Sequence, residues 1–199
     1  LPATPIGGAK PHLVIVVFES TRADVLGKRI DGKPVAPNLA RVAAQGGALA
    51  PAYSHVGFTT ASLKSLFAGS LVVPPGSPSL FRELDASGYE IGVFSGQPED
   101  FGGISAAVGM REVADRFVDA EVLKDQRAFR FAAQGSLLVN ENIVLDRFDA
   151  ALGEAAAWKT PQFVYLNFQT PHFPYHHDAV PHRFAPPPLE RGQIAEDNR

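Results

Sequence analysis

The apolar run LVIVVF at residues 13–18 constrains the fold more than any other feature of this chain, and it ends directly at Glu19. β-branched residues dominate the run, and the lack of polar alternation is typical of a strand buried on both faces of a parallel sheet. The run is far shorter than the roughly 18–20 residues that a membrane-spanning helix needs. It therefore predicts a central strand with a carboxylate at its carboxyl end.

Similar apolar runs recur along the chain, separated by segments with apolar residues at helical spacing. Strands that alternate with helices join through right-handed crossovers and form a sheet with helices on both faces. We therefore predict an α/β fold in which helices sandwich a mostly parallel sheet. Strands are expected at 12–18, 49–53, 89–94 and 162–168, and helices at 37–45, 59–70, 77–87, 122–133 and 137–158.

The composition limits the kinds of site that the chain can build. Its 199 residues suffice for one hydrophobic core, and we expect residues 1–10 to be a linker and residues 11–199 to belong to a single domain. The absence of Cys leaves only oxygen and nitrogen ligands for a metal. A net charge of -3 disfavours a nucleic-acid partner, which is bound mainly through Lys and Arg.

Ligands of a parallel sheet bind beyond the carboxyl ends of its strands, so the residues that follow each predicted strand are the first candidates. These are Glu19 and the segments 95–100 and 170–177. A bare carboxylate at the sheet edge is costly. Glu19 could pair with Arg22 or Arg29, favour a following helix through its dipole, or bind Mg, Mn or Zn.

Thr59 and Thr60 stand at the start of a predicted helix, shortly after Gly57. The free N–H groups of a helix N-terminus favour an anion such as phosphate. A threonine hydroxyl there is either an ordinary N-cap or, when a base or a metal activates it, a nucleophile. Lys64 lies within the first two turns and could help to hold an anion.

The segment QTPHFPYHHD at residues 169–178 is rich in histidine. Pro171 and Pro174 exclude a regular helix, so His172 and His176 cannot form the helical pair of a zinc site. Two interpretations stay open: a loop that presents one or two imidazoles to a ligand, and a solvated surface loop.

Several of these segments together resemble the sulfatase and alkaline phosphatase superfamily. The pattern is most similar to its phosphoglycerol and phosphoethanolamine transferases, a branch that includes lipoteichoic acid synthase. The resemblance extends over nearly the whole chain. The segments that resemble the branch are Val14–Asp24, Ala36–Gly46, Ala52–Ser54, Thr59–Gly69, Ser95–Gly102 and Thr170–Tyr175.

The resemblance implies a metal ligand and a nucleophile. Glu19 falls where the branch has its acidic metal ligand, and Thr59 where it has the hydroxyl that binds the metal and becomes phosphorylated. Thr60 is the alternative nucleophile. Sulfatases instead place a Cys or Ser, converted to formylglycine, in a C/S-x-P-x-R motif. The window TTASL at 59–63 lacks that residue, the Pro and the Arg, which disfavours sulfate-ester hydrolysis by that mechanism.

The resemblance also implies a substrate pocket. His172 matches the histidine that faces the substrate phosphate in the branch. Gln97 and Asp100 belong to a segment, residues 97–101, that lines the same pocket in relatives. With Lys64, these are the predicted substrate-binding residues.

One part of the superfamily's site has no counterpart in this sequence. Relatives complete the metal site with an Asp–His pair from a later strand end, whereas His177 and Asp178 occur in the reverse order and too early. Relatives also continue past the region of residues 197–199. The resemblance thus implies the N-terminal part of a catalytic domain, incomplete at its C-terminus and inactive alone.

The expected function of the full-length parent is metal-dependent transfer of a phosphoglycerol or phosphoethanolamine head group through a phosphothreonine. The metal would be Mn, Mg or Zn. The partners would be a phospholipid-derived donor and an alcohol or glycan acceptor, and the site of action extracytoplasmic, in the soluble domain of a membrane-anchored protein. Two alternatives stay open: a phosphodiesterase, phosphatase or sulfatase-like hydrolase of the same fold, and an inactive anion-binding pseudoenzyme.

Overall fold

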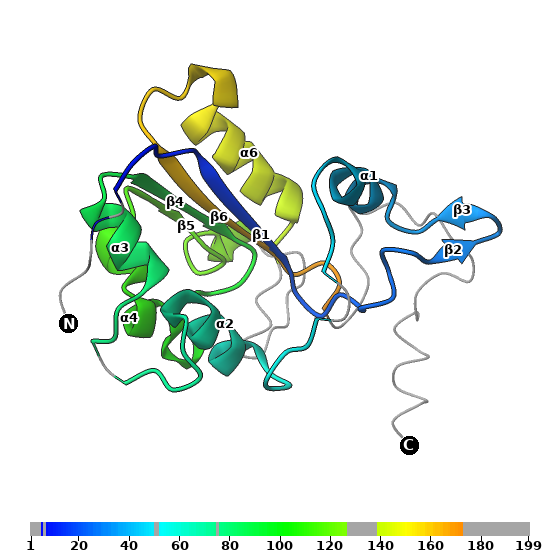
Figure 1. The fold of residues 1–199 in the computed structure, drawn as a ribbon, viewed down its shortest axis with the longest axis horizontal. Coiled ribbons are helices and arrows are strands. Elements are labelled where there is room, and N and C mark those ends of the chain that lie inside the picture. The colour runs from blue at the N-terminus through cyan, green and yellow to red at the C-terminus, as the bar shows by residue number, and fades with distance from the viewer. Residues whose placement is uncertain (1–4, 6, 50–51, 75, 127–138, 173–199) are drawn as a thin grey trace.

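A parallel four-stranded sheet forms the centre of the protein. The computed structural model describes residues 5, 7–49, 52–74, 76–126 and 139–172. The strands are β1 (Leu13–Phe18), β4 (Glu90–Ser95), β5 (Arg116–Val118) and β6 (Gln162–Phe168), in the order β1-β6-β4-β5. All three pairings are parallel, and helices lie on both faces (Figure 1). The predicted α/β fold is confirmed.

One face of the sheet is covered by α2 (Thr59–Ala68), α3 (Leu80–Ala86), α4 (Ile104–Val108) and α5 (Met110–Val113). The core on this side is aromatic, because Phe67 and Phe81 both meet Tyr165 of β6 edge to face, at ring-centroid distances of 5.1 and 6.1 Å. Such pairs add stabilisation beyond the area they bury. This packing fixes the position of α2 against the central strand.

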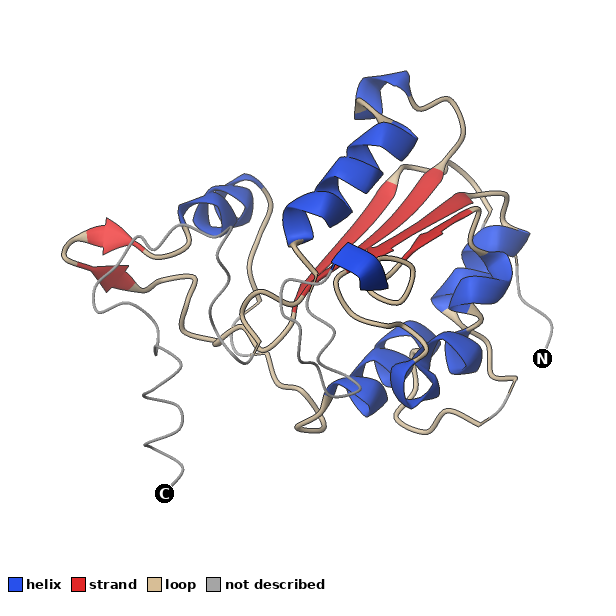
Figure 2. Cartoon of the chain, turned by 180° about the vertical axis from the view of Figure 1, so that it is seen from behind, coloured by secondary structure: helices blue, strands red, loops and turns tan. Residues whose placement is uncertain are grey.

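The opposite face is covered by α6 (Glu141–Leu152), which Figure 2 shows across the sheet from the other helices. The helix begins where the Asn140 side chain accepts a hydrogen bond from the N–H of Asn142. Phe148 packs edge to face on Phe94 of β4 at 5.5 Å. β4 and β6 are therefore buried on both faces, as their continuous apolar sequences predict.

The prediction that the first strand is buried on both faces is wrong for β1. Its residues alternate between half-buried and exposed, and Val14, Val16 and Phe18 are 50%, 42% and 40% exposed. β1 pairs only with β6, and α6 packs against β4 and β5. Within the part of the chain that the structure describes, nothing covers the outer half of β1.

Several predicted boundaries are also corrected. Described residues of the segment 49–53 are coil rather than strand, and residues 122–126 form turns and a short 3-10 helix, η2 (Lys124–Gln126), instead of an α-helix.

The helix expected over 137–158 is α6 alone, because Gly153 ends it; a separate turn, η3 (Ala155–Ala157), follows. Residues 127–133 and 137–138 lie outside the described residues. The helix expected at 77–87 is α3, which begins only after Ser79 caps it.

A small outlying unit precedes α2 in the chain. It contains the hairpin of β2 (Arg29–Ile30) and β3 (Lys33–Pro34) and helix α1 (Pro37–Gln45), which lie beside the sheet rather than on it (Figure 1). Asp31 and Gly32 both have positive φ, at 49° and 74°, as a two-residue hairpin turn requires. No helix among the described residues is both long and apolar enough to span a membrane.

Candidate active site

The carboxyl end of β1 meets the start of α2. The Glu19 N–H donates to the carbonyl of Phe168 over 2.9 Å, which extends the sheet pairing and holds Glu19 at the sheet edge. The Thr59 hydroxyl donates to Glu19 Oε1 over 2.9 Å. The structure thus brings together the predicted metal ligand and the predicted nucleophile, which lie far apart in the sequence.

The backbone beside Glu19 has an unusual conformation. Ser20 has φ of 57°, in the left-handed region that a residue other than glycine seldom adopts, and its hydroxyl donates to Glu19 Oε1 over 3.2 Å. The chain then continues in turns, so the helix considered for the residues after Glu19 does not form. Arg22 pairs with Asp24 at 2.8 Å, and Arg29 donates to the Gly32 carbonyl, so neither is the ion-pair partner of Glu19.

The N-terminus of α2 has no side-chain cap. Phe58 occupies the N-cap position with extended backbone and contributes no capping hydrogen bond. Because Thr59 lies within the helix and its hydroxyl turns to Glu19, it does not act as the ordinary N-cap that the sequence left open. The first N–H groups of the helix stay available to an anion.

The loop after β4 packs against the first two turns of α2. Its turn η1 (Phe101–Gly103) brings Gly102 against Thr60, where a Cβ on Gly102 would lie 2.3 Å from the Thr60 methyl carbon. Lys64 Nζ donates to the Gly102 carbonyl over 2.6 Å. Lys64, predicted to bind substrate, therefore links α2 to this loop. Thr60 is the residue of α2 that packs against Gly102.

A closed polar network lies beneath this loop. Glu99, fully buried, accepts hydrogen bonds from Ser95 Oγ at 2.5 Å, Asn167 Nδ2 at 3.0 Å and Gln97 Nε2 at 3.3 Å. Gln169 Nε2 donates to Asn167 Oδ1 at 3.2 Å. Gln97, predicted to bind substrate, is only 6% exposed and belongs to this network.

Burial raises the pKa of Glu99 from 4.5 to about 7, because loss of hydration outweighs the stabilising hydrogen bonds from Ser95, Asn167 and Gln97. The nearby carboxylate of Asp119 adds to the increase. Burial likewise raises the pKa of Tyr165 well above its usual value, with smaller contributions from Glu99 and Glu19. Tyr165 therefore lies within electrostatic reach of both carboxylates.

The raised pKa of Glu99 predicts a pH-dependent stability. Between about pH 4.5 and 7 the native state keeps a proton that the unfolded chain releases, so the stabilisation present below pH 4.5 is lost as the pH rises to 7. We expect the unfolding free energy of the wild type to fall by up to about 3 kcal/mol relative to Glu99→Gln across this range. Urea unfolding of both proteins at a series of pH values measures this difference in unfolding free energy. If the unfolding free energies of the wild type and Glu99→Gln change with pH in the same way, the prediction is contradicted. Glu112→Gln, which removes an exposed carboxylate, is the control.

His172 lies at the end of the described chain, after β6. Its N–H donates to the Gln169 carbonyl at 2.8 Å. The carboxylate of Glu141 binds the loop in front of it by accepting from the N–H groups of Gln169 and Thr170 and from the Thr170 hydroxyl. Burial raises the pKa of Glu141, and these hydrogen bonds oppose the increase. Glu141 thus fixes the backbone from which His172 projects.

The remaining predicted residues either form an ion pair of their own or lie outside the described chain. Asp100 is exposed and pairs with Arg111 at 2.8 Å. Arg111 also reaches the buried Asp119 at 3.4 Å. The other histidines of the predicted loop, His176 and His177, and the neighbouring Asp178 lie outside the described residues.

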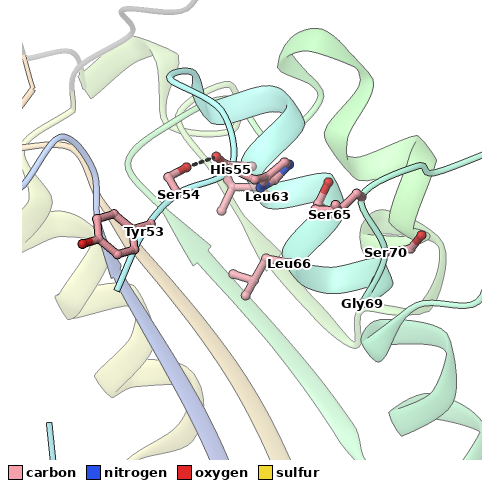
Figure 3. Close-up of a pocket in the computed structure, with 10 residues that line it drawn as sticks. Tyr53, Ser54, His55, Leu63, Ser65, Leu66, Gly69 and Ser70 are labelled. Carbon is pink, nitrogen blue, oxygen red and sulfur yellow. Dashed lines mark hydrogen bonds between the residues drawn. The ribbon is translucent and has the colours of Figure 1, made fainter. Parts of the chain in front are cut away.

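A pocket of about 400 Å³ lies beside α2 (Figure 3). Its lining combines Leu63 and Leu66 with the hydroxyls of Ser54 and Ser62, which are hydrogen-bonded at 2.9 Å. Neither Glu19 nor any other predicted site residue lines it. The pocket is therefore distinct from the edge of the sheet where the predicted nucleophile lies.

The Glu19–Thr59 pair suits a divalent cation as part of its coordination. A carboxylate and a hydroxyl oxygen at one sheet edge are ligands that Mg, Mn and Zn all accept. Among the described residues, no group of three or more His, Asp or Glu is placed to hold a metal ion. The described chain thus offers two oxygen donors at this edge, too few to hold a divalent cation by themselves.

Three acidic side chains were not anticipated from the sequence: Glu99 and Asp119, which are buried, and Glu141, which is half-buried. The segment 95–100 was a candidate because it follows a predicted strand, but the sequence does not show which of its polar side chains turns inward. Asp119 follows β5, which is too short to be recognised from its pattern. Glu141 is the first residue of α6, where an acidic residue is common for other reasons, whereas the sequence predicts that this helix begins at residue 137.

Fold and site together define an alkaline phosphatase-like α/β domain, with a carboxylate and a hydroxyl at the carboxyl edge of a parallel sheet. A sequence model of the sulfatase family matches residues 11–190, and the chain belongs to this family. No curated protein sequence matches it.

Two solved structures share the fold. The lipoteichoic acid synthase LtaP from Listeria monocytogenes superposes with a TM-score of 0.66 at 14% identity, over 89% of this chain and 45% of that protein. A protein in the alkaline phosphatase superfamily from Vibrio parahaemolyticus superposes with a TM-score of 0.62 at 19% identity, over 92% and 46%. The chain thus spans less than half the length of either structure.

Proposed function

We propose that this chain is the N-terminal part of a catalytic domain that transfers a phosphorylated alcohol head group, phosphoglycerol or phosphoethanolamine, through a phosphothreonine at Thr59. The donor would be derived from a phospholipid and the acceptor would be an alcohol or glycan. The full-length protein would act outside the cytoplasm as a membrane-anchored enzyme. Membership of the sulfatase family and the structural likeness to a lipoteichoic acid synthase support the proposal.

The single observation behind this proposal is the hydrogen bond from Thr59 to Glu19 at the uncapped start of α2. The hydroxyl faces a carboxylate that can take its proton. The free N–H groups of the first helical turn lie beside the same oxygen and favour a phosphate. The proposed nucleophile, its proton acceptor and the proposed anion site would therefore coincide at one point of the sheet edge.

In the first half-reaction, the Thr59 oxygen would form a bond to phosphorus as its proton passes to Glu19. The bond between phosphorus and the lipid alcohol breaks, and the leaving oxygen takes up a proton from solvent. In the second half-reaction, the acceptor oxygen attacks phosphorus and its proton passes to solvent. The Thr59–phosphorus bond breaks, and the threonine regains its proton from Glu19. A divalent cation held by Glu19, Thr59 and ligands from elsewhere would supply electrostatic stabilisation of the charged phosphoryl oxygens.

The other predicted residues would act around the phosphate. His172 would donate a hydrogen bond to a phosphoryl or leaving oxygen, on a loop that Glu141 holds in place. Lys64 would contribute positive charge near the first turn of α2, from its position against Gly102. Gln97 and Asp100 belong to the loop that packs on α2 and would shape the same side of the site.

Product analysis tests the proposed transfer. The full-length protein is incubated with Mn²⁺ and vesicles that contain phosphatidylglycerol or phosphatidylethanolamine, with and without an added alcohol acceptor. We expect diacylglycerol release to increase with the acceptor and the head group to appear on it. Free head-group phosphate as the sole product, even with acceptor present, would contradict transfer and favour the hydrolase alternative. Absence of any product from either lipid would contradict both.

A further inference from the structure

The carboxylate of Glu99 is buried at the carboxyl edge of the sheet but is not part of the proposed chemistry. Its side chain is fully buried, and three neutral donors face its two oxygens: Ser95, Gln97 and Asn167. Burying a carboxylate is costly, so its presence here needs a compensating role. The hydrogen bonds join the loop after β4 to the ends of two neighbouring strands, which indicates what that role is.

The backbone of Glu99 is tied down as firmly as its side chain. Its N–H donates to the buried carboxylate of Asp119 at 3.1 Å, and its carbonyl accepts from the N–H of Ser105 at 2.9 Å. The loop is thus bound to β4, to β6, to the segment after β5 and to α4 through one residue. Loss of the carboxylate would release the side-chain part of this attachment and leave buried donors without an acceptor.

The far end of the same loop presses on α2. Gly102 lies so close to Thr60 that a single added methyl group would overlap its side chain, and Gly102 has φ of 59°, which favours glycine. Lys64 holds the Gly102 carbonyl from the next turn of the helix. Because the contact has no free space, a shift of the loop must be transmitted to the first turn of α2.

We propose that Glu99 is a positioning residue, which holds the loop 97–103 against α2 and thereby sets the position of Thr59 opposite Glu19. Glu99 touches neither Thr59 nor Glu19 and acts through the loop and Thr60. This inference rests on the proposed role of Thr59 as nucleophile. It adds a structural element, outside the reacting groups, on which the geometry of that nucleophile depends.

The test uses Glu99→Gln in the full-length protein at pH 8, where most Glu99 side chains are ionised. Glutamine keeps the volume but replaces one acceptor oxygen with a donor that faces other donors. We expect kcat for head-group transfer to fall about ten- to hundredfold with KM within about twofold, since a misplaced nucleophile slows chemistry more than binding. We also expect faster amide hydrogen exchange in residues 59–64 and 97–103, with exchange in β6 unchanged. Glu121→Gln is the matched control, because its carboxylate is exposed and, among the described residues, its one ion pair is with Lys124.

The exchange measurement decides the inference even without activity. Unchanged exchange at residues 59–64 in Glu99→Gln would overturn the inference. A wild-type kcat in Glu99→Gln would also overturn it, provided that Thr59→Ala is inactive. If Thr59→Ala keeps its turnover, the proposed function fails, and the exchange data alone still report on the loop. Should Glu99→Gln not fold, Gly102→Ala disturbs the same contact from its other end. It must then accelerate exchange in residues 59–64, and unchanged exchange there would equally overturn the inference.

Discussion

Thr59→Ala is expected to abolish the covalent phosphoenzyme and to lower head-group transfer by the full-length protein by roughly a thousandfold or more, because the variant lacks the attacking oxygen. The hydroxyl is the group that faces Glu19 at 2.9 Å. Turnover with phospholipid vesicles and mass spectrometry of the quenched enzyme measure the two effects. The protein should stay folded, since Thr59 is only partly buried and its Cβ would be retained.

Two further variants make the result specific. Thr59→Ser keeps a hydroxyl at the same place and should retain part of the turnover and the phospho-adduct. Thr60→Ala tests the alternative nucleophile, which packs on Gly102 rather than facing Glu19. An inactive Thr60→Ala with an active Thr59→Ala would transfer the nucleophile assignment to Thr60.

Glu19→Gln is expected to weaken binding of Mn²⁺ to the full-length protein by at least about tenfold and to lower turnover by roughly a hundredfold or more. Glutamine preserves the size of the side chain and an acceptor oxygen for Thr59, so the change removes charge with little change in packing. Calorimetric titration with Mn²⁺ and the transfer assay measure the two effects. Removal of divalent metal with a chelator should bring wild-type activity down to the level of the variant.

Asp24→Asn is the control for this experiment. Asp24 lies on the same segment as Glu19, but its carboxylate is exposed and pairs with Arg22. Its loss should leave Mn²⁺ affinity and turnover close to those of the wild type. Wild-type Mn²⁺ binding by Glu19→Gln would show that the cation is held elsewhere.

Three of the strands could be predicted to within about one residue because their apolar runs stand out from the surrounding sequence. β1, β4 and β6 lie where the patterns place them, and so do the starts of α1 and α2. Short elements gave no such signal. Residues 104–113 form two helices divided by Gly109, and β5 has only three residues, so these elements are too short for a repeating pattern to be recognised.

The burial of β1 could not be read from its sequence because burial depends on neighbours. An apolar run predicts that a strand can be covered on both faces, whereas covering requires another element on each side. β4 has neighbours on both edges and helices on both faces, and β1 has a neighbour on one edge. The same residue types therefore end up with different exposure.

The candidate site was predicted in part. The resemblance to phosphoglycerol transferases indicated Glu19 and Thr59, and their hydrogen bond is consistent with those roles, which stay predictions. The supporting carboxylates could not be found in this way. Whether Glu99 faces solvent, like its neighbour Asp100, or turns into the sheet depends on a loop conformation that the sequence pattern does not specify.

The pairing of β1 has a consequence for how the protein is made. Its partner β6 is encoded near the other end of the described chain, with Leu13 opposite Phe163. At synthesis rates of about 5–20 residues per second, the first strand waits roughly 10 to 30 seconds on the ribosome before that partner emerges. The apolar strand that ends in Glu19 is thus translated well before the strand that it pairs with, and it stays without this partner over that interval.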